Sequence, residues 1–147
     1  YNKLRIKNAI GNIRGLEFRR LNDTEGDTGV VLIFYLQDPD LTGRFADALK
    51  AEGIATSSMH NKSVPDWHIY THWEMILNKW TATSEGCPYT CDYYLKKGGK
   101  IQYSAEMNPN TIQYLQRSIH IDIPPQMTEE DCDMIADGIY KVANAYL

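Results

Sequence analysis

The segment from Ser118 to Ile123 alternates between polar residues and isoleucines. This period of two predicts a strand that buries one face. After Pro124 and Pro125, Thr128 can cap a helix, and the acidic residues that follow it favour the positive end of a helix dipole. Apolar residues then recur at three- and four-residue spacing, namely Cys132, Ile135, Ala136, Ile139, Val142, Ala143 and Tyr146. The pattern predicts that the chain closes with a strand, a turn and an amphipathic helix.

Two more strands and a helix are predicted upstream. Leu16 to Leu21 and Val30 to Leu36 are joined by a loop rich in Asp, Thr and Gly, so we expect them to pair as a long-looped hairpin. Asp38 followed by Pro39 is typical of a helix start. Ile54 to Ser57 follows this helix and is expected to be a strand, which would complete a strand, helix, strand unit.

The remaining segments predict shorter helices. Tyr1 to Ile10 is expected to be the end of a helix whose body lies upstream, and Asn108 to Arg117 forms another helix. A helix starting at Asp66 would present one apolar side, made of Ile69, Trp73, Ile76, Leu77 and Trp80. Between Thr81 and Met107 the pattern is irregular and indicates loops, with one short helix around Asp92 to Lys97.

Together these elements predict an α/β chain in the form of an α+β two-layer sandwich. Its small, mostly antiparallel sheet would carry helices on one face. A length of 147 residues suits a single domain with its own core, spanning residues 1–147.

Composition narrows the function classes. The formal net charge of −4 comes without any dense group of lysines and arginines, so neither a nucleic acid nor an anionic membrane is an expected partner. The longest apolar run, Val30 to Leu36, is far shorter than the ~20 residues that a membrane-spanning helix needs. Three cysteines, an odd number, argue against a disulfide framework and predict a reducing compartment, with the cytoplasm as the expected location.

Several polar groups have a spacing that allows chemistry. His68 and His72, like Cys87 and Cys91, are four residues apart, which suits two zinc ligands on one helical face. The simpler interpretation, which we favour, is that the histidines form hydrogen bonds at a helix edge and the cysteines act as small buried hydrophobic residues. No metal ligand is therefore assigned.

Two other interpretations stay open in the same way. His120 and Asp122 share one face of a strand, where an imidazole and a carboxylate can pair, although a simple exposed polar face is the favoured interpretation. Lys62 follows a serine-containing segment, as in enzymes that form a Schiff base. No glycine-rich phosphate loop follows it, so an exposed loop lysine is the favoured interpretation.

The order of these parts resembles the C-terminus of the DegT/DnrJ/EryC1/StrS family of sugar aminotransferases, which are fold-type I enzymes that depend on pyridoxal phosphate. The resemblance covers most of the chain from about Leu16. It lies in the Asn108-Pro109 helix, the Ile-x-Ile-x-Ile strand and the Thr128-Glu129-Glu130-Asp131 helix start, together with a loop that contains His60 and Trp67-His68. The turn departs from the family pattern, because Pro124, Pro125 and Gln126 stand where the family usually has one proline and a glycine.

The resemblance implies that substrate binding and catalysis belong to two different domains. The chain would be the small C-terminal domain, with residues 1–10 as the tail of the inter-domain helix. The lysine that carries pyridoxal phosphate would belong to a large domain absent from this chain, so the fragment alone would be inert and none of its own residues is assigned as catalytic. His60 and His68 would face the substrate, a keto-sugar or nucleotide-linked keto-sugar that receives an amino group from an amino acid. The full-length enzyme would be a homodimer. The alternative is a free-standing α/β ligand-binding module without catalysis.

Overall fold

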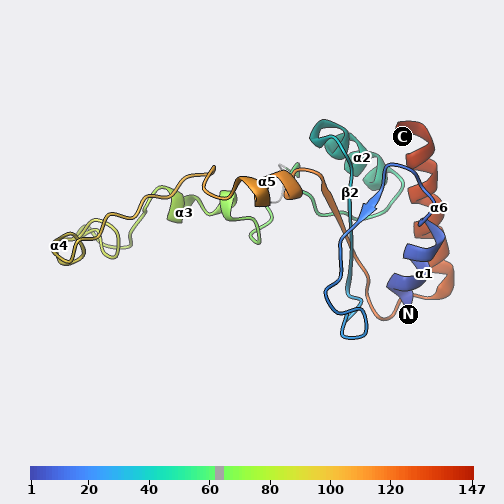
Figure 1. Ribbon diagram of the computed structural model, residues 1–147, viewed down its shortest axis with the longest axis horizontal. Coiled ribbons are helices and arrows are strands. Elements are labelled where there is room, and N and C mark those ends of the chain that lie inside the picture. The colour runs from blue at the N-terminus through green and yellow to red at the C-terminus, as the bar shows by residue number, and fades with distance from the viewer. Residues whose placement is uncertain (62–64) are drawn as a thin grey trace.

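The body of the protein is built on three antiparallel strands, β1 (Glu17–Phe18), β2 (Val31–Tyr35) and β3 (Ser118–Asp122). We describe it from a computed structural model, in which residues 1–61 and 65–147 are placed (Figure 1). The strands lie in the order β1-β2-β3, so β2 is central. Phe18 faces Phe34 across the first pair, and Ile33 faces His120 across the second.

Three helices cover one face of this sheet, as the sequence pattern predicted. They are α1 (Asn2–Ala9), α2 (Pro39–Ala51) and α6 (Glu129–Tyr146). Their apolar stripes and the inner face of the sheet form one core, which includes Ile6, Ile10, Leu32, Phe34, Phe45, Leu49, Ile119, Ile121, Cys132, Ile139 and Val142. Within it the ring of Phe45 meets that of Phe34 edge to face, with centroids 6.2 Å apart. The α+β arrangement with helices on one face of a small antiparallel sheet is therefore confirmed.

The helix starts predicted at Asp38 and Thr128 are confirmed. The side chain of Asp38 accepts a hydrogen bond from the backbone N–H of Asp40, 2.9 Å away. Thr128 forms a reciprocal capping box with Asp131, in which the backbone N–H of each residue donates to the side chain of the other. These bonds hold the pKa of Asp131 below its usual value. Gly53, just beyond the end of α2, has φ +85°, a left-handed conformation that favours glycine.

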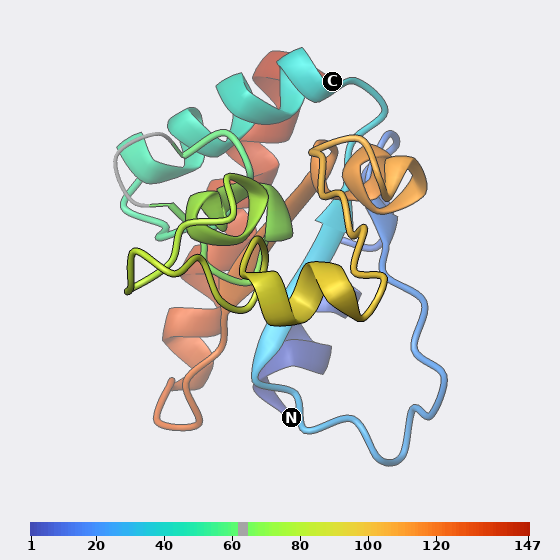
Figure 2. The same ribbon diagram turned by 90° about the vertical axis from the view of Figure 1, so that its left-hand side faces the viewer.

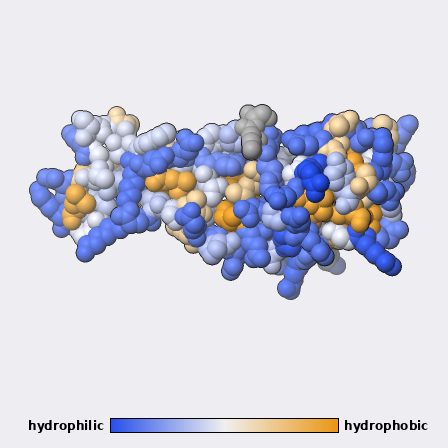
Figure 3. Space-filling model, turned by 90° about the horizontal axis from the view of Figure 1, so that it is seen from above, coloured by the Kyte–Doolittle hydropathy of each residue, from blue (hydrophilic) through white to orange (hydrophobic). Residues whose placement is uncertain are grey.

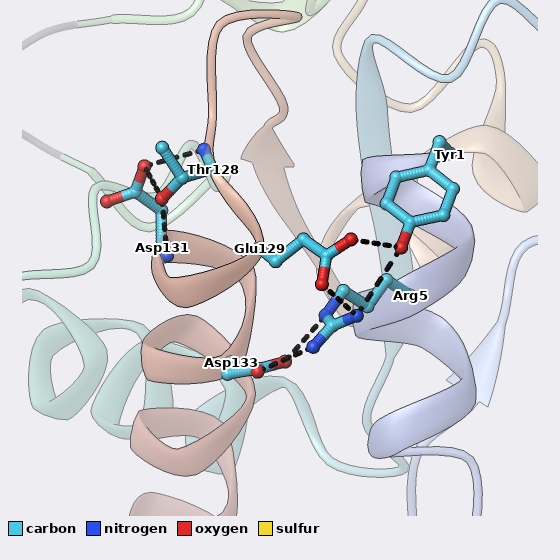
Figure 4. A network of polar contacts seen from close by, with 6 residues as sticks. All are labelled: Tyr1, Arg5, Thr128, Glu129, Asp131 and Asp133. Atoms are coloured by element: carbon cyan, nitrogen blue, oxygen red, sulfur yellow. Dashed lines mark hydrogen bonds and ion pairs between the residues drawn. The ribbon is translucent and has the colours of Figure 1, made fainter.

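An ion-pair network joins α1 to the start of α6 (Figure 4). The guanidinium of Arg5 donates two parallel hydrogen bonds of 2.7 Å to the carboxylate of Asp133 and one of 3.1 Å to Glu129. The bond with Asp133 is the main reason why the pKa of Arg5 is raised. The phenol of Tyr1 adds a bond to the carboxylate of Glu129. This network fixes the register between the two helices at their exposed edge, while Ile6 packs beneath it.

A long arm leaves the sheet on the face opposite α1 and α6 (Figures 1 and 2). It spans residues 66–116 and contains a 3₁₀ helix (Tyr70–His72), α3 (Glu74–Leu77), α4 (Asp92–Lys96) and α5 (Pro109–Leu115). Many of its large apolar side chains are exposed, including Trp67, Trp73, Met75, Trp80, Tyr93, Leu95 and Tyr114. In Figure 3 the hydrophobic atoms along the arm fall in separate groups between hydrophilic ones. Among the described helices, none combines the length and the apolar character that a membrane crossing requires.

Two predicted elements are wrong. The segment from Ile54 to Ser57 is not a strand, since only Ser57 pairs with β3, through a single antiparallel bridge to His120. The long helix predicted from Asp66 is broken into the 3₁₀ helix and α3, because Trp73 between them has φ −84° and ψ 64°. Within the predicted stripe Ile69 is buried, but Trp73 and Trp80 are exposed, so little packing would stabilise a longer helix here.

The cysteine prediction also needs correction. Cys87 and Cys91 form a disulfide near the far end of the arm, and Cys132 is a free, buried cysteine of α6. An odd number of cysteines argues against a framework of bridges but not against one local pair. Two residues four positions apart in a tight turn can be bridged without any other cysteine, and here their Cα atoms lie 4.8 Å apart.

Candidate functional site

A pocket of about 630 Å³ lies where the arm joins the open face of the sheet. Its floor is formed by β2 and β3, which contribute Val31, His120 and Asp122. One wall is formed by Ser57, Ser58 and Asn61, and the other by residues 65–68, where the arm begins. The pocket is therefore built from segments more than fifty residues apart in the chain, which the antiparallel pairing of β3 with β2 brings together.

Asp66 organises the wall made by the arm. One of its carboxylate oxygens accepts hydrogen bonds from the backbone N–H of His68, at 2.9 Å, and from the imidazole Nδ1 of the same residue, at 2.8 Å. Its backbone carbonyl accepts a further bond from Nδ1 of His72, at 2.8 Å. Partial burial acts to raise the pKa of Asp66, but the two bonds from His68 outweigh it and hold this pKa below its usual value. Asp66 is therefore ionised at neutral pH and orients both histidines.

His120 stands on the floor of the pocket. Its backbone exchanges two hydrogen bonds of 2.9 Å with Ser57, and its ring Nε2 lies 3.1 Å from the hydroxyl oxygen of Ser118. Burial lowers the pKa of His120 below its ordinary value of 6.5, against the attraction of Asp66 and Asp122. The ring is therefore neutral at neutral pH, and the sequence-based interpretation of a simple exposed polar face at this position is incomplete.

The structure separates the two histidines that the resemblance selected. The side chain of His68 lines the pocket and is 98% exposed, so it is accessible to a ligand. His60 is half-buried outside the lining, where its Nε2 lies 2.8 Å from the backbone carbonyl oxygen of Gln116, at the end of α5. His60 thus joins the loop after Ser57 to the end of the arm. Lys62 lies outside the described residues.

The sequence-based reasoning missed Asp66, which it treated only as the start of a helix. The available signal was the short spacing between Asp66 and His68. An aspartate commonly accepts a hydrogen bond from the backbone N–H two residues further on, which forms an Asx turn rather than a helix. No sequence pattern indicated that Ser57 and Asn61 line the pocket, because their positions depend on the path of the loop over β3.

The cysteine pair of the zinc alternative is not available as ligands. Cys87 and Cys91 are joined to each other in a disulfide. Within residues 1–61 and 65–147 no group of three or more His, Cys, Asp or Glu side chains is arranged to hold a metal ion.

Among the placed residues of the pocket, no side chain is suited to hold the phosphate of pyridoxal phosphate. Phosphate sites in proteins are built from arginine, lysine or backbone N–H groups at a helix N-terminus. The described part of the lining contains neither lysine nor arginine, and it holds the two carboxylates of Asp66 and Asp122, which repel a phosphate.

Comparison with known proteins adds no assignment. A scan against models of protein families and a search among curated proteins gave no match.

Proposed function

We propose that this chain is the C-terminal small domain of a pyridoxal-phosphate-dependent sugar aminotransferase of the DegT/DnrJ/EryC1/StrS family. In this proposal its pocket binds a keto-sugar or nucleotide-linked keto-sugar. The observation that carries the proposal is the pocket itself, because it gathers His68, Asp66 and Asn61 on the open face of the sheet. The order of motifs in the sequence supports the family, and the pocket supports the type of ligand.

The lining suits a sugar for two physical reasons. Carboxylates, imidazoles, hydroxyls and amides can each bond to the hydroxyl groups of a sugar, and bonds to the ionised groups are the strongest of these. Trp67 is 58% exposed at the rim and supplies an apolar surface. Protein sites for small polar molecules typically combine such a surface with a few fixed polar groups.

The chain would orient the sugar rather than carry out the chemistry. Pyridoxal phosphate and its lysine would belong to the large domain, and the small domain would hold the substrate at a fixed distance from them. Within this proposal His68 contacts the sugar directly. His60 would act as a positioning residue, since its bond to the carbonyl of Gln116 ties the loop of the pocket to the base of the arm. The amino-acid donor and the homodimer would be properties of the full-length enzyme.

The test uses the full-length enzyme. The coding region upstream of Tyr1 should contain a Ser-x-x-x-Lys segment followed by Gly-Glu-Gly-Gly, and the encoded protein should transaminate a keto-sugar. His68→Ala is expected to raise KM for the sugar by about tenfold, the effect of one lost hydrogen bond to a charged or strongly polar group, and to leave KM for the amino donor unchanged.

The control is Tyr93→Ala, because this ring is 73% exposed in α4, far from the pocket. It should leave both constants unchanged. If His68→Ala leaves KM for the sugar unchanged, His68 does not bind the sugar. An unrelated domain or a stop codon upstream, together with a ligand that binds without reaction, would favour the free-standing binding module instead.

A further inference from the structure

The arm of residues 66–116 has almost no core of its own. The structure places all of its residues, and only Ile69 and Cys91 among them are buried. In Figure 1 the arm extends away from the body, so the sheet and the large helices leave most of it uncovered. The arm nevertheless holds nine of the fifteen large apolar side chains that are exposed on the described chain, namely Trp67, Trp73, Met75, Trp80, Tyr93, Leu95, Ile101, Met107 and Tyr114. Exposed apolar surface on this scale is typical of an interaction site.

The aromatic residues are divided between the body and the arm by type. The three phenylalanines, Phe18, Phe34 and Phe45, belong to the body, where the last two are fully buried. All three tryptophans and six of the ten tyrosines belong to the arm. Tryptophan and tyrosine join an apolar ring to a polar group, and both are enriched at protein interfaces. The composition of the arm is therefore that of a contact surface, whereas a disordered linker would be poor in aromatic residues.

The accessible surface of the chain shows how much area is left uncovered. It amounts to 9920 Å² for a mass of 16.8 kDa. A compact monomer of this mass is expected to expose about 7,650 Å², so this chain exposes about 2,300 Å² more. Each subunit of an obligate homodimer buries roughly 1,000 to 2,500 Å². The excess is therefore as large as one side of a stable dimer interface.

The charges of the arm permit contact between two copies. Residues 66–116 contain four lysines and five acidic residues, so their formal net charge is −1, whereas that of the whole chain is −4. Two such arms would meet with little net repulsion. A strongly charged arm would instead favour a partner of opposite charge, such as a nucleic acid.

From the uncovered area, the composition and the charge we infer that the arm is a homodimer contact, in which the arms of two copies of this chain pack against each other. Both copies use the same surface, so the contact is isologous and has a twofold axis. The first residues of the arm, 66–68, line the pocket, so the contact is assigned to the part from Trp73 onward. This contact goes beyond the proposed function and does not depend on it.

Sedimentation equilibrium of the chain between about 1 and 200 µM tests the association directly. At the upper concentrations we expect a mass of twice 16.8 kDa. Tryptophan emission reports on the arm alone, because all three tryptophans lie there. The emission should shift to shorter wavelength over the same range of concentration, since Trp73 and Trp80, which are 42% and 60% exposed in the single chain, leave water in the dimer.

Two matched variants locate the contact. Met75 is 52% exposed in α3 of the arm, and Met134 is 65% exposed in α6, on the other side of the sheet. Met75→Glu should weaken the association by roughly tenfold or more, because the dimer would bury a carboxylate without a partner. Met134→Glu should leave it unchanged. Leu95→Glu, in α4 of the arm, should act like Met75→Glu, and circular dichroism should show a folded body in all three variants.

A chain that remains monomeric at about 200 µM would overturn the inference. A dimer that forms without a change in tryptophan emission would do the same, because the arm would not be part of its contact. Equal weakening by Met134→Glu and Met75→Glu would also contradict it, since α6 would then contribute as much as the arm. The proposed function is tested separately, by the kinetics of the full-length enzyme.

Discussion

Substitutions at Ile6 and Arg5 test which interaction docks α1 onto the body of the protein. Ile6 is fully buried, whereas Arg5 makes its ion pairs at the exposed edge of the same helix. Replacing Ile6 by alanine removes three carbon groups at about 0.8 kcal/mol each, or roughly 2.4 kcal/mol. The cavity left behind raises the expected loss to about 3 to 4 kcal/mol of unfolding free energy. Ile6→Val, which removes one carbon, should cost about 1 kcal/mol.

The ion pairs are expected to contribute much less. The side chains of Arg5 and its partner Asp133 are 32% and 53% exposed, so water and salt screen their attraction. Arg5→Ala should therefore lower stability by only a small fraction of the Ile6→Ala effect, and that loss should shrink further in 1 M NaCl.

Urea unfolding followed by circular dichroism at 222 nm measures each variant. Leu4→Ala is the matched control, because Leu4 lies on the same helix and is 59% exposed. It should change the midpoint very little. The reasoning is refuted if Arg5→Ala costs as much as Ile6→Ala, or if Leu4→Ala costs as much as either.

Three further predictions concern a helix cap, two glycines and a buried imidazole. Thr128→Ala should lower the unfolding free energy by about 1 kcal/mol. Glu130→Gln leaves the capping box intact and should lower it clearly less. Equal losses of the two variants in urea unfolding would contradict the role of the cap. Gly53→Ala should lower the unfolding free energy by about 1 kcal/mol or more, because Gly53 has a positive φ. Gly43 lies inside α2 and an added Cβ would make only ordinary contact with His60, so Gly43→Ala should raise the unfolding free energy by up to about 1 kcal/mol. In thermal unfolding the two variants should shift the midpoint in opposite directions. Because the folded-state pKa of His120 lies below 6.5, the unfolded chain binds a proton more readily, so stability should fall as pH drops below about 6.5. His120→Gln should reduce this slope in urea titrations, and an unchanged slope would show that His120 is not its source.

The helices and strands of the body were predictable because their signals are local. A period of two marks β3, and a capped apolar stripe marks α6; both depend on residues within a few positions of one another. The helix predicted from Asp66 failed for the converse reason. Its apolar stripe resembles that of α6, but a stripe stabilises a helix only where a core receives it, and in the arm Trp73 and Trp80 remain exposed.

For the site, the sequence by itself indicated that His120 and Asp122 share one face of a strand, and the family resemblance selected His60 and His68. Only the tertiary structure decided that these groups line one pocket and that His60 lies outside it, bonded to Gln116. Such contacts join residues more than fifty positions apart, and they depend on the register of β3 against β2 and on the path of a loop. Neither the register of β3 nor the path of the loop produces a periodic pattern in the sequence. Hydrogen bonds between distant side chains depend on positions in space and not on spacing along the chain.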